Sequence, residues 1–429
     1  MTETAETAGP PKPKGKVRWI ICALLFLAVV LSYIDRLVIG VLKPSLSAEY
    51  GWTETGYANM TLVFQAFYGI GFLFFGRLID KIGARWGYLL AMGIWTVSHM
   101  AHALVTSTRD FALMRIPLAI GESGTYPAAL AAASQWFNRR ERAFAIGVFN
   151  AGANLGAIIT PVLVPALTLT LGWQSAFIIT GLFNIVWLVA WWVFYRKPRD
   201  HKMVQADELA WIESEPAVDV GRSSILGVLR YRQTWAYMSG RFLIDPIWWT
   251  FLFWLPDFFS KQFHVNLSGF GPPLVAIYLL SDVGAIAGGW TSSHLLGKGW
   301  KTGSARKFAM LLSALVVVPV TFSAQAPSMW LAVILIGMAT AGHQGFSTNL
   351  FAIPGDLFPR HAQGAVVGLG GFAGALGSMI MSKYAGIVLE SIGTYTPIFV
   401  VSGFAYLTAL VVTHLFNPHY EPVKMDHSS

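Results

Sequence analysis

Long apolar segments recur along almost the whole of this 429-residue chain, and they constrain its fold more than any other feature. About 20 apolar residues in a helix cross the ~30 Å hydrocarbon core of a bilayer. Helices and closed barrels are the only structures that satisfy every backbone hydrogen bond in lipid. We therefore expect an all-α membrane protein with twelve transmembrane helices, at residues 18–42, 57–79, 86–106, 109–133, 142–168, 173–195, 233–259, 270–294, 305–324, 327–352, 361–388 and 394–416.

The composition agrees with a protein embedded in a lipid bilayer. Charged residues make up 12% of the chain and hydrophobic residues 55%, whereas a soluble domain has about 25% charged residues. Cys22 is the single cysteine, so we expect no disulfide framework and no cysteine-based metal site. No phosphate-binding loop or metal-ligand cluster stands out either, so we expect no metal and no cofactor. The first apolar segment is longer than a signal peptide and has no small-x-small site before Asp35, so we expect no cleavable signal.

The net charge of +8 is explained by topology rather than by nucleic-acid binding. Basic residues concentrate in alternate loops, which by the positive-inside rule places both termini in the cytoplasm. The residues that follow this pattern are Lys12, Lys14, Lys16, Arg18, Arg77, Lys81, Arg85, Arg139, Arg140, Arg142, Lys298, Lys301, Arg306, Lys307 and Arg360. Lys43, Arg109 and Lys261 are exceptions, since they fall on the other side.

A long polar stretch divides the predicted helices six and six. The predicted organisation is a cytoplasmic tail (1–17), a six-helix half (18–195), a cytoplasmic linker (196–232), a second six-helix half (233–416) and a cytoplasmic tail (417–429). Two halves predict an internal repeat, and residues 121–156 align with 342–377 without a gap, sharing glycines and a Phe-x-Arg. In this register Glu122 lies opposite His343.

Local motifs within these halves resemble a known family. "GRLIDKIGARWG" (76–87) resembles the loop between helices two and three of the major facilitator superfamily. Within it, three stretches resemble the anion:cation symporters: "SYIDRLVIGVLKP" (32–44), "MRIPLAIGESGTYPAALAAASQWFNRRERAFAIGVFNAGANLGA" (114–157) and "RFLIDPIWWTFLFWLPDFF" (241–259). "WQSAFIITG" (173–181) and "GHQGFS" (342–347) are most similar to bacterial hexuronate transporters. The resemblance implies the major facilitator fold, alternating access and a bacterial cytoplasmic (inner) membrane.

The first of these motifs also implies a conformational latch, formed by Gly76, Asp80, Lys81, Gly83 and Arg85. In this interpretation Asp80 caps a helix end and pairs with a nearby Arg or Lys. The equivalent stretch of the second half, 289–300, has a serine in place of the aspartate, so only one latch is complete.

Four charged residues inside the predicted spans are the main site candidates. A charge at the bilayer centre costs roughly 2.5–3.5 kcal/mol on insertion scales, so such residues are functional by default. Arg36 and Arg115 are expected to bind the substrate carboxylate, because a guanidinium matches a carboxylate with two hydrogen bonds. Asp35 and Glu122 are expected to carry protons, since burial favours the neutral carboxyl and an adjacent arginine the ionised one. The alternative for each is a structural ion pair, Asp35 with Arg36 and Arg115 with Glu122.

Further polar and aromatic residues at mid-span depth are weaker candidates for binding sugar hydroxyls or stacking on a sugar ring. They are Tyr33, Tyr68, Asn150, Trp248, Trp249, His343, Gln344, Ser347 and Asn349. The alternative for the hydrogen-bonding residues is helix–helix hydrogen bonding, and for the two tryptophans it is packing. Lys383 and Asp245 remain without an assigned role.

These patterns predict a monomeric, proton-coupled symporter that imports a sugar-acid anion, with a hexuronate such as galacturonate or glucuronate as the expected substrate. A hexonate, an aldarate, tartrate or an aromatic carboxylate is the alternative within transport. Outside transport, the alternatives are a membrane enzyme acting on lipid and a nutrient sensor that has lost transport. The enzyme would need catalytic residues at the membrane–water boundary, whereas these charges lie at mid-span, so we expect no enzyme.

Overall fold

The structure is a computed structural model that describes residues 13, 15–214, 225–423 and 425. The N-terminal half contains α1 (Val17–Tyr50), α2 (Glu54–Ala101), η1 (His102–Leu104), α3 (Thr108–Ser123), α4 (Thr125–Trp136), α5 (Arg139–Leu171) and α6 (Trp173–Phe194). The segment between the halves contains η2 (Pro198–Asp200), α7 (Ala206–Ile212) and α8 (Ile225–Val228). The C-terminal half contains α9 (Arg232–Phe263), η3 (Leu267–Gly269), α10 (Gly271–Gly297), α11 (Thr302–Val317), η4 (Val318–Gln325), α12 (Met329–Leu350), α13 (Ile353–Leu357), α14 (Arg360–Ser391) and α15 (Thr396–Phe416).

The expected twelve membrane-crossing segments are confirmed, although some are joined and others divided. Gly83 has φ 78° and ψ 165°, a conformation that glycine adopts readily, and it bends α2 into two crossing segments. One further crossing is divided into α3 and α4, and another into α11 and η4. Nine of the described helices are long and apolar enough to cross a membrane by hydropathy alone. The segments below that threshold include α3 and α9, which contain the buried charged residues Arg115, Glu122, Asp245 and Asp257.

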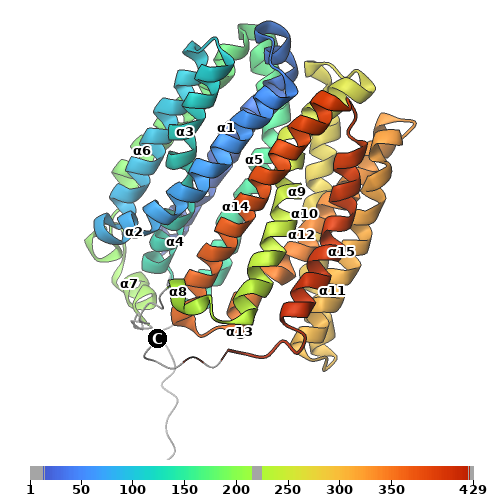
Figure 1. Cartoon of the computed structure of the whole chain (residues 1–429). Coiled ribbons are helices and arrows are strands. Elements are labelled where there is room, and N and C mark those ends of the chain that lie inside the picture. Colours follow the sequence, from blue (N-terminus) through green and yellow to red (C-terminus); the bar gives the residue numbers. More distant parts are fainter. Residues whose placement is uncertain (1–12, 14, 215–224, 424, 426–429) are drawn as a thin grey trace, which may run out of the picture.

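The helices of the two halves run roughly parallel to one another and lie side by side (Figure 1). Here the end of the bundle where α1 begins, and where α8 and α13 lie, is named the basic face. The end where α1 stops at Tyr50 is named the opposite face. The halves meet along α1 and α9, α2 and α14, and α5 and α10. A Cβ at Gly386 of α14 would lie 2.4 Å from the Cβ of Ala58 of α2, so glycine permits this close approach.

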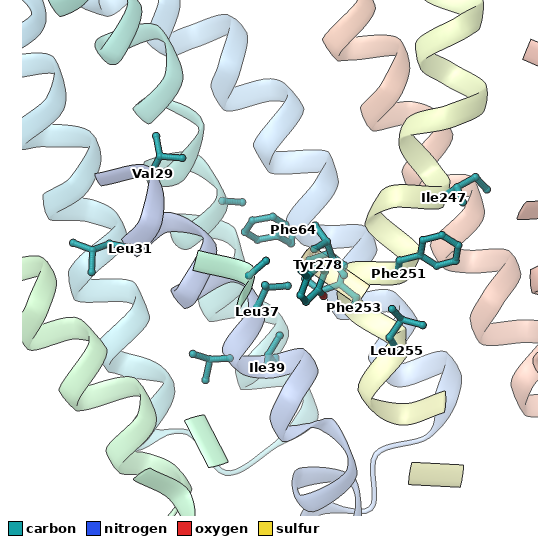
Figure 2. Packing of buried hydrophobic residues seen from close by; sticks show 14 of the residues in the cluster. Val29, Leu31, Leu37, Ile39, Phe64, Ile247, Phe251, Phe253, Leu255 and Tyr278 are labelled. Carbon is teal, nitrogen blue, oxygen red and sulfur yellow. The ribbon is translucent and has the colours of Figure 1, made fainter. Parts of the chain in front are cut away.

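The aromatic core continues across the junction of the halves. Phe64 of α2 and Phe253 of α9 have ring centroids 6.2 Å apart, beside Leu37 of α1 (Figure 2). The Tyr57 hydroxyl donates to the Phe253 carbonyl at 2.9 Å, which adds a polar contact between α2 and α9. Side chains of both halves therefore surround the mid-membrane part of α1.

The segment between the halves is attached to the N-terminal half by a buried ion cluster. Glu208 of α7 is fully buried and accepts hydrogen bonds from the backbone N–H groups of Val17 and Arg18 at 3.2 and 3.1 Å. These N–H groups belong to the first turn of α1, and N–H groups in the first turn of a helix have no acceptor within the helix. The Arg18 guanidinium pairs with Glu208 at 3.1 Å and with Glu141 of α5 at 2.8 Å. The carboxylate of α7 therefore caps α1 at the basic face.

A second ion cluster joins the halves near the opposite face. Lys43 of α1 is 1% exposed and pairs with Glu54 of α2 at 2.8 Å and with Asp257 of α9 at 2.6 Å. Lys261 of α9 pairs with the same two carboxylates, and the Tyr395 hydroxyl donates to Asp257. Lys43 and Lys261 were exceptions to the distribution of basic residues among the loops. The structure places both on helices, where the carboxylates of this inter-half cluster neutralise them.

Candidate functional site

Arg36 and Glu122 form a buried ion pair between α1 and α3. The Arg36 Nη2 and Nε atoms lie 2.8 and 2.9 Å from Glu122 Oε2, and the two residues are 4% and 1% exposed. Glu122 sits one residue before the end of α3. A Cβ at the preceding residue, Gly121, would lie 2.6 Å from the backbone nitrogen of Trp95, so glycine lets α3 pack directly against α2. This contact holds the end of α3 against the second crossing segment of α2.

The Arg36 guanidinium also lies among aromatic rings from both halves. Its carbon is 4.9 Å from the Tyr33 centroid, 5.0 Å from Tyr68 and 4.9 Å from Trp249. Such distances are typical of cation–π interactions, which strengthen when the cation is desolvated. Three of the expected binding residues are therefore adjacent to Arg36, and one of them, Trp249, belongs to α9 of the other half.

Arg115 lies near this pair but has no comparable counter-charge contact. Its guanidinium carbon is 4.5 Å from the Phe64 centroid and 5.7 Å from the Phe253 centroid, and the residue is 1% exposed. Nε and Nη2 are buried without a hydrogen-bond partner among the described residues. A buried arginine without a paired anion costs free energy, so this position favours the binding of an anion to Arg115.

No ion pair joins Asp35 to Arg36 in the described structure, so the alternative interpretation, a structural pair between these neighbours, is wrong. Consecutive residues on a helix point in directions about 100° apart, so they do not face each other. The Asp35 carboxylate instead faces α2 and α6, where Oδ2 accepts hydrogen bonds from Trp95 Nε1 at 2.7 Å and Asn184 Nδ2 at 2.5 Å. His99 Nε2 lies 3.1 Å from Oδ1. The expected pairing of Arg115 with Glu122 is likewise replaced by the Arg36–Glu122 pair.

The expected residues of the second half form a separate group. The Trp248 and His343 rings stack with centroids 4.9 Å apart and planes 8° apart. His343 Nδ1 is 2.7 Å from the Tyr406 hydroxyl, and Nε2 is 3.3 Å from Ser347 Oγ. Helices α9, α12 and α15 thus bring together Trp248, His343 and Ser347. Trp248 directly precedes Trp249, which contacts Arg36.

The remaining candidates are more scattered. Asn349 is fully buried and donates to the backbone carbonyls of Gly288 and Gly345 at 3.1 and 3.0 Å, so it joins α12 to α10. Asn150 on α5 is exposed and Gln344 on α12 is half-buried. Their roles in binding stay predictions.

The proposed latch residues lie around the bend of α2. Gly83 is the residue at the bend, and Arg85 donates to the Trp192 carbonyl at 2.9 Å and stacks over its ring at 4.7 Å. Gly76 has open space around it, and Lys81 is exposed. The side chain of Asp80 lies outside the described part of the structure, so the latch stays a prediction.

Two ionisable groups, the buried His99 and the half-buried Arg241, were not identified as candidates from the sequence. His99 is an ionisable residue inside a predicted span, and this property could have identified it as a candidate. Arg241 pairs with Asp245 of the same helix, α9, at 2.6 Å. Their i, i+4 spacing was visible in the sequence. Lys383, also unassigned, donates to Asn59 Oδ1 at 3.0 Å and so links α14 to α2.

Comparison with known proteins gives a consistent result over most of the chain. The family model of the Major Facilitator Superfamily matches residues 25–382. The hexuronate transporter of Escherichia coli (strain K12) is 31% identical over 415 residues, which cover 94% of each chain. The galacturonate transporter of Dickeya chrysanthemi is 32% identical over 314 residues, which cover 72% of this chain and 90% of its own.

A solved structure supports the fold independently. The crystal structure of a bacterial homologue of the human lysosomal transporter Spinster, inward-facing and unoccupied, matches with a TM-score of 0.70. The match covers 95% of this chain and 97% of that one at 16% sequence identity. At this identity the likeness concerns the fold alone.

Proposed function

The chain belongs to the Major Facilitator Superfamily and is a multi-pass membrane transporter of organic anions, not an enzyme, and we propose that it imports a hexuronate together with protons. Galacturonate and glucuronate are the proposed substrates. The proposed location is the bacterial inner membrane, with a monomer as the working unit. Both termini, and therefore the basic face, lie in the cytoplasm, as the loop charges favour.

One observation carries this proposal: two buried arginines lie at the junction of the halves, and among the described residues they share a single ion-paired carboxylate, Glu122. Arg36 is paired with Glu122, and Arg115 contacts aromatic rings. A substrate carboxylate would supply the missing negative charge, and a planar guanidinium binds it with two hydrogen bonds. The Tyr33, Tyr68 and Trp249 rings beside Arg36 offer surfaces for the sugar.

Proton coupling follows from competition for Arg36. A carboxylate that binds Arg36 displaces Glu122, and a displaced carboxylate buried away from cations is strongly favoured to take up a proton. Release of the substrate toward the cytoplasm lets Glu122 lose the proton and pair with Arg36 again. Binding of substrate and of proton then favour each other, as linkage requires. Asp35 is the second proposed proton site.

Counterflow in proteoliposomes tests the substrate class. The purified protein is reconstituted with galacturonate inside, and labelled galacturonate uptake is measured against competing glucuronate, gluconate, galactarate and glucose. We expect glucuronate to compete strongly and glucose not at all. Stronger competition by gluconate or galactarate would move the assignment to a hexonate or an aldarate. Competition by glucose equal to that of glucuronate would overturn the anion assignment, and binding without counterflow would indicate a sensor.

A further inference from the structure

The Asp35 carboxylate lies in a polar cluster of the N-terminal half that substrate recognition does not use. Both oxygens are buried, and Oδ2 is occupied by the neutral donors Trp95 and Asn184. Oδ1 has no aligned hydrogen bond among the described residues, and its neighbour there is His99 Nε2 at 3.1 Å. Oδ1 is therefore the oxygen on which a proton would be held, and the imidazole is the ionisable group in contact with it.

The neighbours of His99 define which nitrogen carries its proton. His99 Nε2 is 2.7 Å from the Thr180 hydroxyl oxygen, and that hydroxyl donates to the Ala176 carbonyl at 2.7 Å. This arrangement leaves the Thr180 oxygen to accept from Nε2, and the relay argued below uses the tautomer with the proton on Nε2 and the lone pair on Nδ1. Nδ1 is fully buried without a partner among the described residues. The ring is thus arranged to accept a proton on one side and to release one toward Asp35 on the other.

A second buried imidazole extends this arrangement toward the opposite face. His102 Nδ1 lies 2.8 Å from the Ser98 carbonyl oxygen, so Nδ1 is the donor and Nε2 holds the lone pair, again without a described partner. The His99 and His102 centroids are 6.4 Å apart, and both rings pack on Phe177. Two residues later, Leu104 is 83% exposed at the end of η1. The cluster therefore begins at Asp35 and ends close to the surface.

The other charged groups near this cluster come from α1 and α3. The Arg115 charge interacts electrostatically with the imidazoles of His99 and His102. The carboxyl groups of Glu122 and Asp35 interact electrostatically with each other. Arg36 is turned toward Glu122 and the aromatic rings. From α2 and α6 the groups that touch Asp35 are otherwise neutral: Trp95, Asn184 and Thr180.

We propose that His99, assisted by His102, transfers protons between Asp35 and the opposite membrane face. A proton that reaches His99 Nδ1 forms an imidazolium, and the Nε2 proton then passes to Asp35 Oδ1. One N–H bond forms, one N–H bond breaks and one O–H bond forms, and the ring is left neutral with its proton on Nδ1. The starting tautomer returns when Nε2 takes up a proton and the resulting imidazolium releases its Nδ1 proton. The proposal rests on the proposed function, in which Asp35 is a proton site.

The test compares two transport modes in proteoliposomes that contain the full-length protein. Galacturonate counterflow can proceed through the loaded carrier, whereas uptake driven by an imposed pH gradient requires proton uptake and release in every cycle. We expect His99→Gln, which keeps a hydrogen-bond donor but cannot relay a proton, to lower the ratio of gradient-driven uptake to counterflow by about tenfold or more. His102→Gln should lower it less. Trp95→Phe, which removes a neutral donor to the same carboxylate but no proton carrier, should lower the ratio less than His99→Gln does.

Retained counterflow in each variant establishes that the protein is folded. Asp35→Asn distinguishes failure of the His99 relay from failure of the proposed function. If Asp35→Asn is uncoupled but His99→Gln keeps the wild-type ratio, the relay is overturned and the proposed function stands. If Asp35→Asn concentrates galacturonate normally, Asp35 is not a proton site, and the relay is overturned with that part of the proposed function. If Trp95→Phe lowers the ratio as much as His99→Gln, the effect comes from positioning of Asp35, and the relay is overturned. Should His99→Gln lose counterflow as well, His99→Asn provides the same comparison with a smaller amide.

Discussion

Arg36 and Arg115 contact the same aromatic ring, Phe64, yet only Arg36 has an acidic partner. Its guanidinium uses both Nε and Nη2 on Glu122, a geometry that lysine cannot reproduce with a single ammonium group. In the proposed mechanism the substrate carboxylate replaces Glu122 as the acceptor of the Arg36 guanidinium hydrogen bonds. The side-chain geometry of Arg36, and not only its charge, should therefore determine binding.

This geometry leads to a prediction for Arg36→Lys. We expect counterflow to fall almost as far as in Arg36→Ala, because loss of charge-assisted hydrogen bonds costs about 1.5–3 kcal/mol, or roughly tenfold to a hundredfold in affinity. Arg199→Lys is the matched control, since its guanidinium is 76% exposed in a surface pair with Glu213. Wild-type counterflow in Arg36→Lys would exclude the two-bond clamp.

Glu122 provides a second prediction at the residue scale. Glu122→Gln resembles the protonated carboxyl and leaves Arg36 without its counter-charge, so an anion should bind at least as well as in the wild type. Because the amide cannot exchange a proton, uptake against a gradient should be lost while counterflow persists. The measurement is labelled galacturonate uptake with and without an imposed pH gradient. Normal accumulation by this variant would make Glu122 a structural partner of Arg36.

At the scale of helices, glycines determine how closely the helices of each half approach. α10 and α12 provide a clear case, because a Cβ at Gly288 would lie 2.3 Å from the Gly345 Cα, a backbone atom that cannot move aside alone. At the next residue, Gly289, the nearest atom is a Thr348 methyl at 3.6 Å, which is an ordinary contact. The same addition of one carbon therefore has different consequences at adjacent positions.

We predict that Gly288→Ala lowers stability and that Gly289→Ala does not. Overpacking of this kind costs about 1–3 kcal/mol, so the midpoint of thermal unfolding in detergent should be lower for Gly288→Ala than for Gly289→Ala. Both variants gain the same helix propensity from the substitution, of about 1 kcal/mol, which makes them a matched pair. Equal midpoints would mean that α10 and α12 separate without cost.

At the scale of the whole molecule, the Lys43–Glu54–Asp257–Lys261 cluster ties the halves together near the opposite face. The Thr55 N–H to Glu390 hydrogen bond, at 3.1 Å, joins α14 to α2 in the same region. With the proposed orientation, this conformation is closed toward the outside. Opening must break these contacts, so their strength influences the balance between the two conformations.

Asp257→Asn should shift that balance toward the outward-open state. Lys43 would lose a buried partner, and breaking a buried ion pair costs about 3–5 kcal/mol. Met60, which is fully buried and follows Glu54 by six residues on α2, is a suitable reporter. In a Cys22→Ala, Met60→Cys background, labelling by a membrane-impermeant thiol reagent outside the cell should increase about tenfold or more. Asp356→Asn, which breaks a pair with Arg306 within the C-terminal half, should leave labelling unchanged.

The charge moved in each cycle is also a property of the whole molecule. If both Asp35 and Glu122 carry protons with one monoanion, each cycle moves one net positive charge inward. A membrane potential negative inside then contributes about 2.3 kcal/mol per charge per 100 mV. A potassium–valinomycin potential should therefore drive galacturonate uptake at constant pH. Uptake that responds to a pH gradient but not to potential would mean that one proton moves and that one of the two carboxylates is structural.

The sequence by itself determined the membrane-crossing segments and the two-half organisation. Hydropathy is a local property, and lipid requires a helix wherever an apolar segment crosses; the ends of most predicted spans accordingly lie within a few residues of the observed helices, such as 173–195 and α6 (Trp173–Phe194). The charged residues within those spans were equally visible, because any charge in an apolar segment stands out.

Only the tertiary structure decided which charges meet. Arg36 pairs with a carboxylate 86 residues away rather than with its neighbour Asp35. Asp35 meets His99 on α2 and Asn184 on α6, and Lys43 pairs with Asp257 across the two halves. Such partners depend on how each helix is rotated about its axis and which helix packs against it. These are consequences of packing the whole bundle, and they are not encoded in the hydropathy of any single segment.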